Sequence, residues 1–159
     1  MAVRQSSAPP CNERFVLGSD HAGYDLKEQV KRYLLEKSND VEDLVPEFRE
    51  RIDFPGVAEE AGRKVAHGRG RYGVLVCGTG LGMCMAANKV RGVRAALLYN
   101  EAAAEYARRH NDANVLVFGG RTMSFDHARK CLEIFFNHRF EGGRYAERND
   151  YMGRMEERG

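Results

Sequence analysis

Apolar runs without regular polar alternation occur at four places in the chain, and they restrict its fold more than any other feature. They cover residues 15–18, 73–77, 93–99 and 114–118. Strands covered by helices on both faces of a parallel sheet have such continuous apolar runs, whereas strands with one face in water alternate. The runs therefore predict a parallel sheet that is covered on both faces.

Segments of helical period separate these apolar runs. In the first segment Leu26, Val30, Tyr33 and Leu34 recur at helical spacing. Further helices are predicted over residues 55–67, 83–89, 101–109, 125–137 and 144–157, and a less distinct strand over residues 41–45. Strands that alternate with helices predict an α/β fold, a doubly wound three-layer α/β/α sandwich with a parallel sheet of about five strands.

The chain has the size and composition of one globular domain. It has 159 residues, of which 43% are hydrophobic, enough to form a core. The segment MAVRQSSAPP has no periodicity and ends in two prolines. We therefore expect a flexible N-terminal tail over residues 1–12 and a single domain over residues 13–159, including a C-terminal helix.

Charge and cysteine content exclude several classes of partner. The 25 basic and 23 acidic residues give a formal charge of +2, which offers no reason to expect nucleic acid or a membrane as partner. No apolar stretch reaches the ~20 residues of a membrane helix, and a signal peptide is absent from the first residues, so we expect a cytoplasmic protein.

The cysteines form no CxxC pair and show no metal spacing, which predicts free thiols and no metal site.

A glycine-rich loop follows the second apolar run and precedes a helix. It reads Gly78-Thr79-Gly80-Leu81-Gly82, a pattern that directs several backbone amides at one point and suits an oxyanion or a phosphate. The spacing is not GxGxxG and no acidic residue ends the next strand about 20 residues on, which disfavours a dinucleotide cofactor. A tight turn without a ligand is the remaining alternative.

Cys77 ends the strand before this loop, at the carboxyl edge of the predicted sheet. Ligands of open α/β sheets bind at that edge, and the loop amides favour a thiolate there. The alternative is a small apolar strand residue, which is our interpretation of Cys84 and Cys131. A redox role would need Cys84 as resolving thiol, and that residue lies on the following helix.

Further polar side chains follow the ends of other strands. Asp20 and His21 follow the first strand, where Asp20 is also a candidate helix N-cap, and Arg121 follows the strand at residues 114–118. Arg144 and Arg148 lie four residues apart on the last helix, so they either share a phosphate or form a solvated basic face.

His110 and Asn111 lie between a helix and the strand at residues 114–118. By themselves they are typical of a polar loop after a helix, in which basic residues complement the helix C-terminus. The sequence pattern alone therefore assigns no chemistry to this segment.

Four motifs follow one another in the chain: GSDHAGYDLK, VCGTGLGMCMAANKVRGVRAAL, ARRHNDANVLVFGGRTM and EGGRYAER. Together they closely resemble the ribose-5-phosphate isomerase type B family, which includes galactose-6-phosphate isomerase subunits, from residue 14 to about residue 155. The resemblance implies a Rossmann-like sandwich and the interconversion of ribose 5-phosphate and ribulose 5-phosphate in the pentose phosphate pathway, without metal or cofactor.

The same resemblance implies a role for each matching residue. Cys77 is the expected base, Thr79 and Asp20 lie beside the sugar oxygens, and His110 opens the furanose ring. The amides of Gly78, Gly80, Leu81 and Gly82 form a hole for the enediolate, Asn111 holds a hydroxyl, and the phosphate is bound by His21, Arg121, Arg144 and Arg148. Part of this site comes from a neighbouring subunit in the family, which implies a homodimer, or a tetramer, with shared sites.

The chain departs from the family pattern at a few places. Phe54 stands where a tyrosine is usual, and residues 41–52 lack the usual loop rich in glycine, serine and threonine. These departures leave three alternatives open: allose 6-phosphate, galactose 6-phosphate or a tetrulose phosphate as substrate. Met83 is not such a departure: it stands where a branch without the cysteine carries a glutamate, so the chain matches the branch with the cysteine. A non-catalytic phosphosugar-binding domain is the hypothesis from another class.

Overall fold

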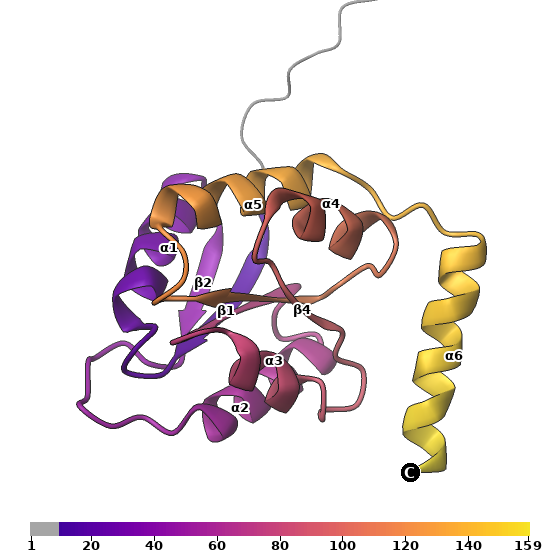
Figure 1. Ribbon diagram of the computed structural model, residues 1–159, viewed down its shortest axis with the longest axis horizontal. Helices are drawn as coiled ribbons and strands as arrows, with labels where there is room; N and C mark the ends of the chain where they lie inside the picture. The colour runs from indigo at the N-terminus through magenta and orange to yellow at the C-terminus, as the bar shows by residue number, and fades with distance from the viewer. Residues whose placement is uncertain (1–9) are drawn as a thin grey trace, which may run out of the picture.

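Five parallel strands form one sheet in the computed structural model, which describes residues 10–159 (Figure 1). In chain order they are β1 (Arg14–Ser19), β2 (Asp40–Asp43), β3 (Tyr72–Cys77), β4 (Ala95–Leu97) and β5 (Val115–Gly119). Their order across the sheet is β2-β1-β3-β5-β4, and every neighbouring pair is parallel. The predicted parallel sheet is confirmed.

Helices cover both faces of the sheet (Figure 1). One face carries α1 (Tyr24–Glu36), α4 (Glu101–Arg109) and α5 (Phe125–Asn137), and the other carries α2 (Phe54–Ala66) and α3 (Leu81–Ala87). A last helix, α6 (Arg144–Arg158), stands away from the sheet. The α/β/α sandwich is therefore the predicted one, with α6 as an addition at its side.

The strands bury side chains on both faces. Phe15 and Leu17 of β1 join the core layer under α1 and α5, whereas Val16 between them joins the layer under α2 and α3. All three are fully buried, and burying one such side chain contributes about 1.5–3 kcal/mol. Burial on both faces explains why the apolar runs lack polar alternation.

Strand β4 is shorter than the predicted strand over residues 93–99. The amide of Arg94 donates to the side-chain oxygen of Asn114 at 2.8 Å, and that of Ala95 donates to the side chain of Asn88 at 2.8 Å. Because side chains take these backbone donors, regular strand pairing begins only at Ala95.

The start of the described chain is held by Asn39. Its Nδ2 donates to the carbonyl of Pro10 at 2.8 Å, its Oδ1 accepts from the amide of Glu13 at 3.0 Å, and Pro10 is buried. Of the expected tail over residues 1–12, residues 1–9 lie outside the described part. Among the described helices, none is long and apolar enough to cross a membrane.

Helix α6 touches the rest of the chain mainly through polar contacts. Glu156 accepts the amide of Gly92 at 3.0 Å, and Asn149 donates to the carbonyl of Asn111 at 3.1 Å. No residue of α6 is buried, and its large apolar side chains stay well exposed, namely Tyr151, Met152 and Met155. The helix therefore presents uncovered apolar surface.

Candidate active site

The order of the strands creates a topological switch point between β1 and β3. These strands are neighbours, but the chain leaves β1 into α1 on one face and leaves β3 into α3 on the opposite face. Ligands of open α/β sheets bind outside the carboxyl ends of strands at such a switch point. The candidate site therefore lies among the loops that follow β1, β3 and β5.

Backbone contacts join these loops into one unit. The amide of Gly120 donates to the carbonyl of Cys77, and that of Arg121 donates to the carbonyl of Gly78, both at 2.8 Å. A Cβ at Gly120 would lie 2.6 Å from the carbonyl oxygen of Ala22, so only glycine allows the loop after β1 to come this close. The backbones of the three loops are consequently held close to one another.

The sulfur of Cys77 accepts a hydrogen bond from the glycine-rich loop. The amide of Gly80 donates to Cys77 Sγ at 3.2 Å, and Cys77 as a residue is only 5% exposed. Gly80 has a φ of +81°, a left-handed conformation that suits glycine and turns its amide back toward the sulfur. The glycine-rich loop therefore places one of its amides directly against the sulfur of Cys77.

Thr79 and Phe54 flank the same loop. The Thr79 side chain is exposed, and its Oγ1 accepts from the amide of Leu81 at 3.3 Å. A Cβ at Gly82 would lie 2.8 Å from the ring of Phe54, so this ring covers the start of α3. The position where the family usually has a tyrosine therefore forms an apolar wall of the site.

The thiols of Cys84 and Cys131 differ from Cys77 in their surroundings. Burial raises the pKa of Cys84 above its usual value and raises that of Cys131 to about 11. Cys131 has no exposed surface and lies in the core layer under α5. Both thiols are therefore protonated at neutral pH, in agreement with their interpretation as packing residues.

Asp20, His21 and Arg121 lie at the same edge as Cys77. The carboxylate of Asp20 accepts from the amide of Gly23 at 2.9 Å; the helix N-cap is Gly23 itself, so Asp20 holds the residue that caps α1. His21 is exposed, and its Nδ1 accepts from the amide of Ile52 at 3.4 Å. The Arg121 guanidinium lies against the glycine-rich loop.

His110 and Asn111 lie near the amino ends of the strands, whereas Cys77 lies at the carboxyl ends. They follow α4 and precede β5, where the amide of Gly73 donates to the carbonyl of Asn114 at 2.9 Å. Gly73 pairs with Val115, whereas Cys77 pairs with Gly119, four residues further along both strands, which corresponds to about 13 Å. Within one chain the structure therefore does not bring His110 and Asn111 to Cys77.

Tyr145 at the start of α6 gathers a second group of the predicted residues. Its ring stacks on His110 with 3.9 Å between centroids and 9° between planes. The Arg144 guanidinium donates to the Tyr145 hydroxyl at 3.0 Å, and that of Arg148 lies 5.6 Å from the ring centroid. Sequence reasoning missed Tyr145, because nothing in the pattern indicates that this helix folds back on a residue 35 positions earlier.

Two groups of potential site residues thus exist in the described chain. The first consists of Asp20, His21, Cys77, Gly78, Thr79, Gly80, Leu81, Gly82 and Arg121, and the second of His110, Asn111, Arg144 and Arg148. Across residues 10–159, no cluster of three or more His, Cys, Asp or Glu side chains is arranged to hold a metal ion. The groups offer a thiol, amide donors, a carboxylate and cations.

A thiol and an amide-lined loop at the switch point of an α/β/α sandwich are suited to bind and act on a small anionic molecule. The model of the family described as Ribose/Galactose Isomerase matches residues 15–152. The chain belongs to this family, and it is an isomerase. The resemblance stated from the motifs is confirmed.

Individual relatives agree with this assignment. The chain is 35% identical to ribose-5-phosphate isomerase B of Escherichia coli K12, over 92% of this chain and 98% of that protein. The structure of the Clostridium thermocellum ribose-5-phosphate isomerase B superposes with a TM-score of 0.88 at 37% identity, covering 91% of this chain and 97% of the other. The Mycoplasma genitalium enzyme, solved with bound ribulose-5-phosphate, has a TM-score of 0.88 at 38% identity, with 94% and 100% covered. These values confirm the predicted fold.

Proposed function

We propose that the chain interconverts ribose 5-phosphate and ribulose 5-phosphate through an enediolate, as a cytoplasmic step of the pentose phosphate pathway. The observation that carries the proposal is the Cys77 sulfur, which accepts a hydrogen bond from the Gly80 amide at the switch point between β1 and β3. The relatives named above support this substrate, since one of them holds ribulose-5-phosphate.

The geometry suggests a role for each group in the proton transfer. An aldose-ketose isomerase needs a base near the hydrogen next to the carbonyl and donors for the oxyanion that forms. In the proposed mechanism the Cys77 thiolate takes the proton from C2 of the open-chain aldose and returns it to C1. Amides of the 78–82 loop stabilise the enediolate oxygens, apart from those of Gly80 and Leu81, which donate to Cys77 Sγ and Thr79 Oγ1. Thr79 and Asp20 bond the sugar hydroxyl groups.

The phosphate is assigned to the cationic groups. His21 and Arg121 lie at the edge that carries Cys77, and both side chains are exposed to an incoming ligand. Arg144 and Arg148 would add two permanent charges, and guanidinium groups bind phosphate through charge-assisted hydrogen bonds. Together these residues would bind the dianion at the end of the sugar opposite the reacting carbons.

A second copy of the chain would complete the site. His110 is proposed to open the sugar ring and Asn111 to hold a hydroxyl, but both lie at the other edge of the sheet within one chain. The exposed apolar side chains of α6 favour contact with another subunit. We therefore propose a homodimer in which each site combines the two groups of residues from different subunits.

An assay of ribulose 5-phosphate formation from ribose 5-phosphate, with a chelator present, tests the proposal. We expect turnover that the chelator leaves unchanged. Faster turnover of allose 6-phosphate, galactose 6-phosphate or a tetrulose phosphate would reassign the substrate within the family. Binding of ribose 5-phosphate without turnover of any of these sugars would identify a non-catalytic binding domain, and loss of turnover on chelation would contradict a reaction without metal.

A further inference from the structure

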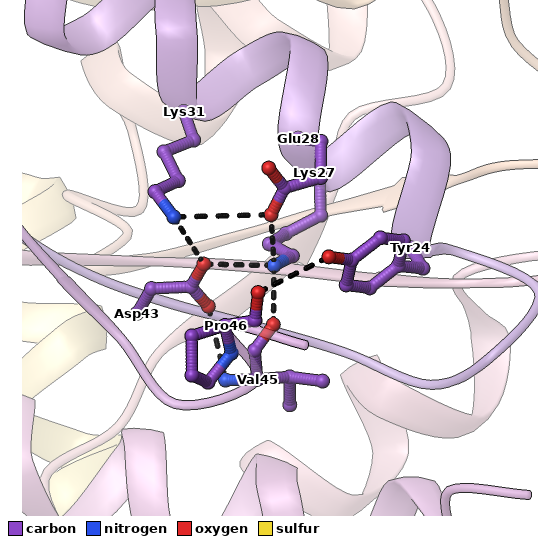
Figure 2. A network of polar contacts seen from close by, with 7 residues as sticks. All are labelled: Tyr24, Lys27, Glu28, Lys31, Asp43, Val45 and Pro46. Atoms are coloured by element: carbon purple, nitrogen blue, oxygen red, sulfur yellow. Dashed lines mark hydrogen bonds and ion pairs between the residues drawn. The ribbon is translucent and has the colours of Figure 1, made fainter. Parts of the chain in front are cut away.

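A fully buried ammonium group lies beside the candidate site but is not part of it. Lys27 on α1 has no exposed side-chain surface. Its Nζ donates to Glu28 Oε1 at 2.6 Å, to Asp43 Oδ2 at 2.8 Å and to the backbone carbonyl of Val45 at 2.6 Å (Figure 2). All three donors of the ammonium are therefore used.

The acceptors of Lys27 lie where the chain leaves β2. Asp43 is the last residue of β2, at the sheet edge that also carries Cys77, and residues 44–53 form an irregular loop from there to α2. The next carbonyl, that of Pro46, accepts from the Tyr24 hydroxyl at 3.1 Å. Two side chains of α1 thus hold two successive carbonyls at the start of the 44–53 loop (Figure 2).

Few residues of this loop are buried, although Leu44 packs against the core and the ring of Phe48 contacts that of Tyr24, with 5.5 Å between centroids. Only Val45 among residues 44–53 is buried, and the loop borders a cavity of about 150 Å³. Near its far end, the amide of Ile52 donates to Nδ1 of His21 at 3.4 Å. An imidazole that accepts at Nδ1 in its neutral form carries its hydrogen on Nε2, which then points away from the loop and is available to a ligand.

We propose that Lys27 is a positioning residue for the sugar phosphate: it fixes the start of the 44–53 loop, and the loop orients the imidazole of His21. The inference rests on the proposed function, in which His21 contacts the phosphate. A buried ion pair gives little net stability compared with an apolar side chain of the same size. The ammonium of Lys27 instead positions its neighbours, because each of its hydrogen bonds fixes the place of one acceptor.

Michaelis constants for ribose 5-phosphate in the Lys27→Met variant test the proposal. We expect the constant to rise about fivefold to tenfold and kcat to change less than twofold, because the loop after β3 is not in contact with Lys27. Lys31→Met is the matched control: Lys31 also bonds Asp43 Oδ2, at 2.9 Å, but makes no bond to the 44–53 loop. This control is expected to leave the constant within twofold of the wild-type value.

A double-mutant cycle with His21→Ala separates positioning from a general structural effect. If Lys27 acts through His21, Lys27→Met raises the Michaelis constant in the wild-type background but adds nothing in the His21→Ala background. An equal rise in both backgrounds, or no rise in a folded Lys27→Met protein, would overturn the proposal.

Two additions keep the cycle decisive. If Lys27→Met does not fold, Tyr24→Phe removes only the bond to Pro46, and the same cycle is then expected to show about a twofold rise that His21→Ala abolishes. A rise that persists with His21→Ala, or no rise, would overturn the proposal here too.

Calorimetric dissociation constants for ribose 5-phosphate give the same comparison without turnover. An inactive wild-type protein would therefore contradict the proposed function and leave the test of Lys27 intact.

Discussion

The imidazole of His110 stacks on the ring of Tyr145, with 3.9 Å between the centroids and an angle of 9° between the planes. The contact joins the end of α4 to the start of α6 and orients a histidine that no helix or strand would otherwise fix. On the far side, Tyr106 lies 4.8 Å from the same imidazole. The histidine therefore contacts two aromatic rings, and its Nε2 lies 3.9 Å from Oε2 of Glu141.

Replacing His110 by asparagine should affect ring opening more than proton transfer at carbon. We expect His110→Asn to lower kcat/KM for ribose 5-phosphate by roughly a hundredfold, the range typical of a lost general acid or base. A sugar phosphate that cannot close a furanose ring should lose much less. Steady-state rates on both substrates make the comparison, and equal losses on the two would contradict the assigned role.

Arg144→Ala should weaken binding of the phosphate. A charge-assisted hydrogen bond contributes about 1.5–3 kcal/mol, which corresponds to an increase of about tenfold to a hundredfold in KM for ribose 5-phosphate. The weak binding of free ribose should hardly change. Arg154→Ala, further along the same helix, is the matched control and should leave both constants unaltered. If ribose and ribose 5-phosphate weakened equally, Arg144 would have a structural role.

Mixing two inactive variants tests whether the sites are shared between subunits. Cys77→Ala and His110→Asn alter groups at opposite edges of one sheet, so a mixed dimer should contain one intact site. Random exchange of subunits is expected to restore about a quarter of the wild-type activity. Each variant alone is the control. Verified heterodimers without activity would show that Cys77 and His110 serve the same site within one chain.

Lowering the pH should remove the contribution that the ionised Asp43 carboxylate makes to the stability of the fold. Burial alone would raise the pKa of this carboxyl, but hydrogen bonds from Lys27 and Lys31 outweigh it and hold the pKa below its usual value. A carboxyl with a lowered pKa in the folded state stabilises the fold above the unfolded-state pKa of about 3.9, and the stabilisation disappears as the pH falls through the folded-state value.

The comparison of the wild-type protein with Asp43→Asn isolates this contribution. The free energy of unfolding in urea should be about 3 kcal/mol lower for the variant at pH 7, because the change leaves Lys27 without a charged partner on β2. The difference should stay constant down to about pH 5 and shrink below pH 4. A difference that is the same at pH 7 and pH 3 would contradict the lowered pKa.

Much of the fold could be predicted because the relevant signals are local. Continuous apolar runs indicated strands buried on both faces, and strand ends placed Asp20, Cys77 and Arg121 at one edge. The predicted start of β4 was wrong, because side chains of Asn88 and Asn114 take backbone donors there. Such bonds depend on tertiary contacts that no local pattern contains.

Lys27 illustrates a second reason why parts of the structure could not be predicted from the sequence. It is spaced three and seven residues from the buried Val30 and Leu34, so it occupies the apolar stripe of α1, and this was a signal that the sequence offered. A lysine at such a position is ordinarily taken to be solvated. What keeps it buried is the carboxylate of Asp43 and the carbonyl of Val45, which are 16 and 18 residues away.

The rate of ribulose 5-phosphate formation by Cys77→Ala tests the central claim most directly, with Cys84→Ala as the matched thiol control. If Cys77 is the base, the Cys77→Ala protein should keep its fold and bind ribose 5-phosphate normally, while kcat falls on the order of a thousandfold or more. The Cys84→Ala protein should keep near-normal turnover. Turnover close to the wild-type rate in a folded Cys77→Ala protein would contradict the assignment of Cys77 as the base.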